Sequence, residues 1–114
     1  MGRERMRRVD EAIRQVIGDA LARDIKDPRV GFVTVTDVKT SPDLRHSRVY
    51  VSVLGNREER AATLEGLRSA HTYLQGRIGS ELHLKFTPEL DFILDETPER
   101  AARVGEILDR EPDA

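Results

Sequence analysis

The sequence predicts an α+β domain whose elements follow in the order α-β-β-α-α-β, with one further helix at the C-terminal end. Apolar residues recur every three or four positions in residues 5–25 and 61–74, as on one face of a helix. β-Branched and aromatic residues alternate with polar ones in residues 30–38, 48–53 and 90–95, as in half-buried strands. Proline-containing turns separate these segments, and 114 residues suit a single core.

The first helix is expected between Arg5 and Ile25, and Asp27-Pro28 ends it, because proline disfavours the α conformation for the residue before it. On a helical wheel Arg3, Arg7 and Arg14 fall within about 40° of one another beside the apolar stripe. The first helix is therefore expected to carry a basic edge.

Two strands should follow as a hairpin around the turn Ser41-Pro42-Asp43. In the second strand Val49, Val51 and Val53 should face one way and the intervening polar residues the other. The alternation slips between Val35 and Val38 in the first strand, which predicts a β-bulge or the end of pairing.

Asn56 is placed to cap the next helix, which has Glu58 and Glu59 in its first turn. Low helix propensity at residues 69–72 predicts a kink or two short helices. The inward residues of this pair are expected to be Ala61, Leu64, Leu67 and Leu74.

The third strand should contain Leu90, Phe92 and Leu94 on its buried side, and Thr97-Pro98-Glu99 should open a final helix through Leu108. Residues 1–108 are thus expected to form one domain, and 109–114 a short acidic tail. The predicted core consists of Ile13, Ile17, Leu21, Val33, Val35, Val49, Val51, Leu67, Leu74, Leu90 and Phe92.

Several classes of function lack support in the composition. The chain has no cysteine, and its three histidines are too scattered to present two metal ligands on one element. It contains none of the phosphate-binding, dinucleotide-binding or serine-hydrolase motifs. The longest uncharged stretches are eight residues, far short of the roughly 20 that a membrane helix needs. We therefore expect a cytoplasmic protein that is not an enzyme, holds no cofactor or metal, and does not contact membranes.

The charge is unevenly distributed. Residues 1–86 carry 16 Lys and Arg against 12 Asp and Glu, whereas residues 87–114 carry three against nine. A polyanion responds to the local field within about 8–10 Å, so a basic body can bind nucleic acid although the net charge is −2. Arginine outnumbers lysine 16 to three, which is as compatible with biased codon usage as with phosphate binding.

The order α-β-β-α-α-β is that of a type II KH domain, in which the junction between the paired helices meets RNA. Gly76-Arg77-Ile78-Gly79 matches the G-x-x-G loop of KH domains, but two fixed glycines arise often by chance or as helix residues. A longer match covers the chain from about Arg5 to Leu108. Its blocks are Asp27–Val38, Ser41–Leu44, Arg48–Val53 and Pro88–Phe92 followed by Asp95, and they resemble the ribosome-binding factor A family of bacterial small-subunit assembly factors.

The resemblance implies a KH-like domain in which an Ala-x-Gly kink replaces the G-x-x-G loop. In this chain the motif falls on Ala70-His71-Thr72, with threonine where the family usually has glycine, and Gly76 and Gly79 then lie inside the second helix of the pair. Threonine resists the left-handed backbone that glycine permits, so a milder kink or a contact through its hydroxyl is expected. A second departure is Leu84-Lys85-Phe86-Thr87, where relatives are richer in arginine.

The resemblance also implies the function. It is that of a monomeric maturation factor that binds the free, immature small ribosomal subunit and its precursor rRNA near the 5′-terminal helix and neck. Such a factor assists rRNA processing and growth at low temperature. Its release is linked to an assembly GTPase. The candidate RNA-binding residues are Arg3, Arg7, Arg8, Arg14, Arg45, Arg48, Arg68, Ala70, Thr72, Arg77 and Lys85. For each arginine, a solvated charge or a weak salt bridge is the plain alternative.

An alternative from another class is a protein-interaction module. It would act through the acidic strand and helix at the C-terminal end, with Glu89, Asp91, Asp95, Glu96, Glu99 and Glu106 as its contacts. A simpler explanation of these acids is solubility and repulsion of RNA from the wrong face.

Overall fold

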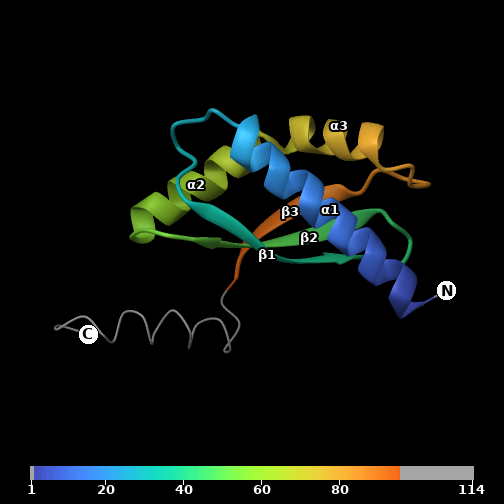
Figure 1. The fold of residues 1–114 in the computed structure, drawn as a ribbon. Coiled ribbons are helices and arrows are strands. Elements are labelled where there is room, and N and C mark those ends of the chain that lie inside the picture. The colour runs from blue at the N-terminus through green and yellow to red at the C-terminus, as the bar shows by residue number, and fades with distance from the viewer. Residues whose placement is uncertain (1, 96–114) are drawn as a thin grey trace.

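A computed structural model describes residues 2–95 of the chain. Helix α1 (Arg3–Arg23) is followed by strands β1 (Val33–Thr40) and β2 (His46–Val53), helices α2 (Arg57–Ser69) and α3 (His71–Glu81), and strand β3 (Glu89–Leu94). This is the predicted order α-β-β-α-α-β (Figure 1). The expected final helix and the tail 109–114 lie outside the described residues.

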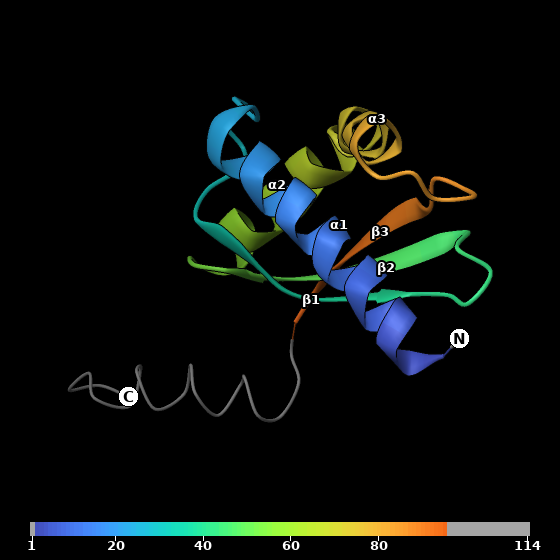
Figure 2. The same cartoon turned by 45° about the vertical axis from the view of Figure 1, so that its right-hand side comes forward.

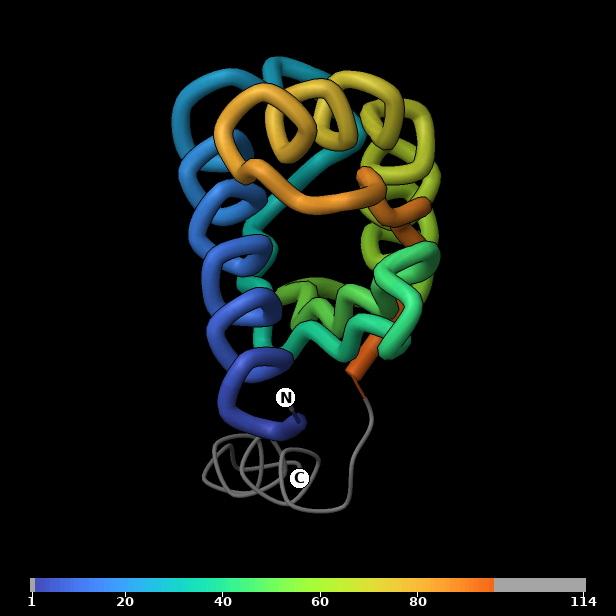
Figure 3. Tube along the Cα trace, turned by 90° about the vertical axis from the view of Figure 1, so that its right-hand side faces the viewer, coloured from blue at the N-terminus to red at the C-terminus, as the bar shows by residue number. Residues whose placement is uncertain are grey.

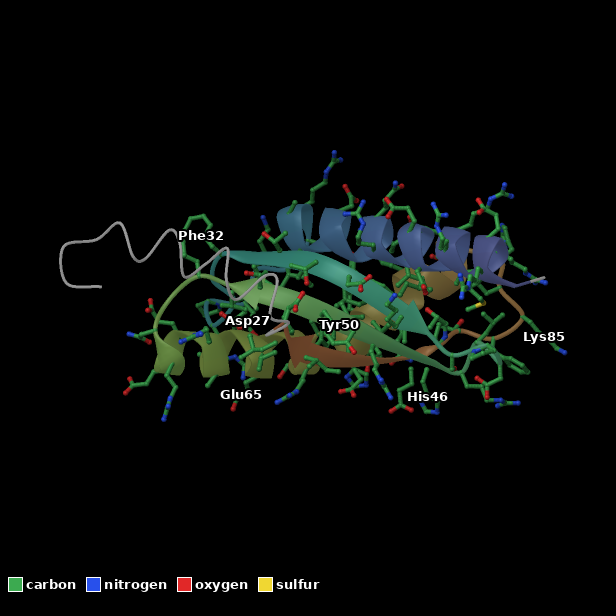
Figure 4. The ribbon with its side chains drawn as sticks, turned by 90° about the horizontal axis from the view of Figure 1, so that it is seen from below. Asp27, Phe32, His46, Tyr50, Glu65 and Lys85 are labelled. Atoms are coloured by element: carbon green, nitrogen blue, oxygen red, sulfur yellow. The ribbon has the colours of Figure 1, made fainter. Side chains whose placement is uncertain are left out.

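The three strands form one sheet in the order β1-β2-β3. β1 pairs antiparallel with β2, and β3 pairs parallel with β2 on its other side. All three helices lie on one face of this sheet, as Figures 1 and 2 show, and Figure 3 shows the two layers from the end of the molecule. The opposite face, with Tyr50, is seen in Figure 4.

The predicted bulge lies in β1. Val35 pairs with Val51 and Asp37 pairs with Tyr50, so Thr36 is the extra residue of the bulge. The Thr36 hydroxyl donates to the Tyr50 carbonyl at 3.2 Å and also bonds the Asp95 carboxylate. The bulge turns both Val35 and Val38 toward the helices.

The core lies between the helices and the sheet. Nine of the eleven predicted core residues are buried, and Leu21 and Val33 are half-buried against them. The prediction that Ala61 faces inward is wrong, because it is exposed and Thr63 and Gly66 are buried on that face of α2 instead. The structure adds to the core Val9, Val16, Ala20, Val38, Leu44 and Ile78.

The kink lies where the sequence predicts it. α2 ends at Ser69 and α3 begins at His71, and Ala70 between them has φ −88° and ψ 1°. The Ala70 N–H donates to the carbonyls of Gly66 and Leu67, at 3.1 and 3.0 Å. Among residues 2–95 only Leu44 and two glycines have positive φ, so Thr72, in the first turn of α3, has an ordinary helical backbone.

Asn56 caps α2 as predicted: its side chain accepts from the Glu59 N–H at 2.8 Å, and the Glu59 carboxylate accepts from the Asn56 N–H at 2.9 Å. Within the described part of the chain, no helix has the length and apolar composition needed to cross a membrane.

Candidate RNA interface

The basic edge of α1 carries acids as well as arginines. Arg3, Arg7 and Arg8 are exposed, and Glu4 lies 3.6 Å from Arg7 and 3.9 Å from Arg8. Arg14 donates through Nε to Glu11 at 2.9 Å, and this bond lowers the pKa of Glu11 to about 2. The structure therefore places the four predicted residues of α1 along one helix, with Arg7, Arg8 and Arg14 each beside an acid.

A second group of cations lies at the end of the molecule where α1 begins. Arg45 is the last residue of the β1–β2 turn, and its guanidinium lies 4.2 Å from the centre of the Phe86 ring. Lys85 Nζ lies 5.6 Å from the same ring. Both cations are exposed, and Figure 4 shows Lys85 at this end of the molecule. The Arg45 carbonyl accepts from the Glu89 N–H at 2.8 Å, which ties the turn to the start of β3.

A hollow of about 560 Å³ joins this end of the molecule to the kink. His71 and Gln75 of α3 line one side of it. The rest of it is lined by Arg45, His46, Phe86, Thr87 and Glu89. Arg45 is thus brought close to His71 of the Ala70–Thr72 kink, from a position far away in the sequence.

The kink itself is accessible. Thr72 is exposed and Ala70 is half-buried. Arg68, in the last turn of α2, is exposed, and its guanidinium approaches the Phe92 carbonyl of β3 at 3.5 Å. The Arg68 carbonyl lies 2.9 Å from Nδ1 of His71. The kink thus presents a hydroxyl, an imidazole and a guanidinium on one stretch of surface.

Arg77 has different surroundings from the other predicted residues. Its guanidinium donates to Glu81 and Asp24 at 2.6 Å each and to Asp19 at 3.2 Å, and its side chain is 20% exposed. The hydrogen bond with Glu81 is the main cause that raises the pKa of Arg77, followed by the one with Asp19. These contacts tie α3 to α1 and favour a structural role, so RNA contact by Arg77 stays a prediction.

Arg48 lies apart from the kink, on the open face of the sheet. It borders a hollow of about 540 Å³ with Lys39, His46 and Asp91. Of the predicted residues, the structure therefore brings Arg45 close to the kink and Lys85 close to the Phe86 ring that Arg45 contacts, while Arg48, Arg77 and the arginines on α1 lie at other places.

Neither Phe86 nor His71 is among the RNA-binding residues that the sequence predicts. The available signal for Phe86 is an aromatic residue next to a lysine, a pairing that suits nucleic-acid surfaces. His71 lies within the recognised kink motif, but only the fold brings it to the hollow with Arg45. Across residues 2–95 no group of three or more His, Asp or Glu side chains is arranged to hold a metal ion.

Residues 5–108 of the chain match the sequence pattern of the ribosome-binding factor A family. It is also 45% identical, over 108 residues, to "Ribosome-binding factor A" of Halothermothrix orenii, covering 95% of this chain and 88% of that protein. The chain belongs to this family.

Solved structures from the same family share the fold. The solution structure of a Thermotoga maritima protein described as a putative ribosome binding factor A is 36% identical, with a TM-score of 0.74 over 83% of this chain and 91% of that one. The crystal structure of ribosome-binding factor A from Thermus thermophilus is 21% identical, with a TM-score of 0.69 over 78% and 94%. The predicted KH-like fold is confirmed.

A third family structure concerns a complex. It is a homology model of the Thermus thermophilus protein, fitted into a cryo-electron-microscopy map of its complex with the 30S subunit. It is 24% identical to this chain, with a TM-score of 0.59 over 74% of this chain and 88% of that one.

Proposed function

We propose that this protein is a non-enzymatic maturation factor that binds the immature small ribosomal subunit and assists rRNA processing and assembly. Membership of the ribosome-binding factor A family supports the proposal, as does the fitting of a relative into a map of a 30S complex. The proposal includes the finer features that the resemblance implies. These are contact with precursor rRNA near the 5′-terminal helix and neck, release linked to an assembly GTPase, importance at low temperature, and a cytoplasmic monomer.

The observation that carries the RNA-binding part is the position of Arg45 and Lys85 around the Phe86 ring, with Arg45 also in the hollow beside His71 of the kink. Both are exposed, and in each the described contact of the cationic group is an aromatic ring rather than a carboxylate. Within residues 2–95 neither forms a salt bridge, unlike Arg14 or Arg77. Phosphate groups are the natural partners of such cations on a protein of this family.

Co-sedimentation with purified ribosomal particles tests the proposal. The protein is expected to pellet with free small subunits and not with complete ribosomes. Arg45→Gln and Lys85→Gln together should weaken binding, and in filter binding each lost phosphate contact should reduce the salt slope by roughly 0.7–0.9. Arg57→Gln is the matched control, because Arg57 is an exposed arginine at the start of α2 and is not among the candidate contacts.

Two results would contradict the proposal: no association of the parent protein with small subunits, or association that does not respond to salt. The second result would favour the alternative of a protein-interaction module at the acidic C-terminal end. Of its contacts, Glu89 and Asp91 are exposed on β3, whereas Glu96, Glu99 and Glu106 lie outside the described residues.

A further inference from the structure

A groove of about 590 Å³ opens where the N-terminal turn of α1, the β1–β2 turn and the segment before β3 meet. Its walls are largely apolar and include Met6, Leu44 and Phe86. Three cations surround it: Arg5, Arg45 and Lys85. It is distinct from the hollow beside the kink, although Arg45 and Phe86 contribute to both.

The β1–β2 turn that forms one side of the groove has a strained backbone. Leu44 has φ 64°, a left-handed conformation that is uncommon for a leucine, and its side chain is 8% exposed. The Leu44 N–H donates to the Ser41 carbonyl at 2.8 Å. Such conformations persist only where the surroundings impose them, and they cluster at functional sites.

Asp43 lowers the net positive charge at this groove, but its carboxylate is already engaged. Oδ1 accepts from the Ser41 hydroxyl at 2.6 Å and from the Arg45 N–H at 3.1 Å. The bond from Ser41 is the main cause that lowers the pKa of Asp43. The carboxylate thereby fixes the turn that presents Arg45.

Phe86 lines both the groove and the hollow. Arg45 lies against it at 4.2 Å and Lys85 at 5.6 Å, so apolar surface and positive charge occur side by side. A nucleotide has the complementary combination, because its base is a flat apolar ring and its phosphate is an anion. Bases within a helix are stacked on each other, so a surface of this kind suits a base that is unpaired.

We propose that this groove binds one unpaired nucleotide of the RNA, with the base against Phe86 and the Arg45 guanidinium and the adjoining phosphate at Lys85 and Arg5. This inference rests on the proposed function, because it names the form of RNA that the protein recognises. The groove is thus a second RNA-binding position in addition to the hollow beside the kink, and Phe86 lines both.

Phe86→Trp gives a direct probe, because the chain contains no tryptophan. A base that stacks on the indole should quench its fluorescence. The ligands are two RNA hairpins of the same stem, each closed by a non-nucleotide linker so that no loop base is unpaired. One carries a single bulged adenosine and the other is fully paired. We expect quenching with the bulged hairpin and little or none with the paired one.

Affinity measurements give the second test. Phe86→Leu should weaken binding of the bulged hairpin by roughly 5- to 150-fold, the range found when an aromatic stacking partner is lost, and leave the paired hairpin within about twofold of the parent. Lys85→Gln should weaken binding of both hairpins, because a phosphate contact carries no information about pairing. Arg57→Gln should change neither. Thermal melting checks that each variant folds, and if Phe86→Leu does not, Phe86→Met takes its place, because methionine fills irregular core space without an aromatic face.

Equal affinity of the parent for the two hairpins, or unchanged fluorescence of Phe86→Trp with the bulged hairpin, would overturn the inference. Co-sedimentation separates this failure from that of the proposed function. If the parent still pellets with free small subunits but does not distinguish the hairpins, only the nucleotide groove is excluded.

Discussion

The role of an individual side chain here depends on residues that are far away in the sequence. The sequence predicts Arg77 as an RNA contact because it follows the kink, yet Asp19 and Asp24 from the end of α1 surround its guanidinium together with Glu81. Arg45 looks no different in the sequence, but its neighbour is an aromatic ring. Sequence patterns place both arginines on the surface without showing which one meets carboxylates.

We predict that Arg77→Gln lowers the melting temperature of the protein more than Arg7→Gln does. Removing Arg77 leaves three carboxylates near one another without their shared cation, whereas Arg7 makes a single long contact with Glu4 on an exposed helix face. Circular dichroism melts at low and high salt measure this. The difference should shrink in high salt, because salt screens repulsion between exposed acids. Equal melting of the two variants would contradict the structural role of Arg77.

The loop after α1 carries a pH-dependent contact. Asp27 accepts from the side chain and the N–H of Arg29, and these bonds lower the pKa of Asp27 from 3.8 to about 2. A carboxylate with a lowered folded-state pKa stabilises the protein above its unfolded-state pKa, and this is lost as the pH falls through the folded-state value.

We therefore predict that Asp27→Asn melts below the parent at pH 6 and that the difference disappears between about pH 4 and pH 2. Melting curves recorded from about pH 6 to pH 2 measure this. A group whose pKa is raised on folding would show the opposite pH dependence, because its stabilisation is lost as the pH rises. A constant difference across this range would show that Asp27 acts through packing rather than charge.

At the scale of elements, the strands and the kink are predictable because their signals are local. Alternation in β1 fails between Val35 and Val38, and the bulge residue Thr36 lies between them. The sequence does not show how much of the strand continues beyond the bulge, so Val38 is missing from the predicted core although it is 2% exposed. The inward face of α2 is wrongly predicted at Ala61, because the loop before β1 packs against Thr63 and Gly66.

Gly66 shows how closely that loop approaches α2. A Cβ at this position would lie 2.7 Å from Cγ2 of Val30, and a branched side chain next to its own backbone has little freedom to move away. At Gly76 in α3 the same Cβ would meet nothing within 4 Å. The two helical glycines differ only in their surroundings.

We predict that Gly66→Ala destabilises the protein by about 1–3 kcal/mol, as overpacking does. Gly76→Ala should instead stabilise it by up to about 1 kcal/mol, because alanine has the higher helix propensity. Urea titrations of both variants measure the free energies of unfolding. A stabilised Gly66→Ala would mean that the loop at Val30 can move away from α2.

At the scale of the whole molecule, the sheet brings together the parts of the site and of the core. β2 is its central strand, and Val51 is fully buried between partners on β1 and β3. Ser52, the next residue, points to the opposite face and is half-buried. The residues of β2 that face inward can be predicted from the alternation in the sequence. The position of β3 beside β2 is known only from the structure.

We predict that Val51→Asp unfolds the protein and that Ser52→Asp does not. A charge at Val51 would be buried without a partner in a domain whose total stability is about 5–15 kcal/mol. Near-ultraviolet circular dichroism and melting curves distinguish a folded from an unfolded variant. A cooperative transition of Val51→Asp at the temperature of the parent would contradict the inward orientation of this strand face.

The uneven charge of the chain is also a property of the whole molecule, and it distinguishes the two proposed functions. Replacing Glu96, Glu99 and Glu106 by glutamine raises the net charge from −2 to +1 without changing the length of the chain. If these acids repel RNA, the triple variant should bind RNA hairpins and small subunits more tightly than the parent, and the gain should shrink as salt rises. If they form the contact surface of a protein partner, co-sedimentation with small subunits should fall while affinity for protein-free RNA does not.

A second variant controls for net charge alone. In it Arg23, Arg57 and Arg60 are replaced by glutamine, which lowers the net charge by the same amount away from the kink. If the glutamate variant binds RNA more tightly, and the arginine variant binds RNA more weakly by a smaller factor, then the RNA-binding surface lies near the acids.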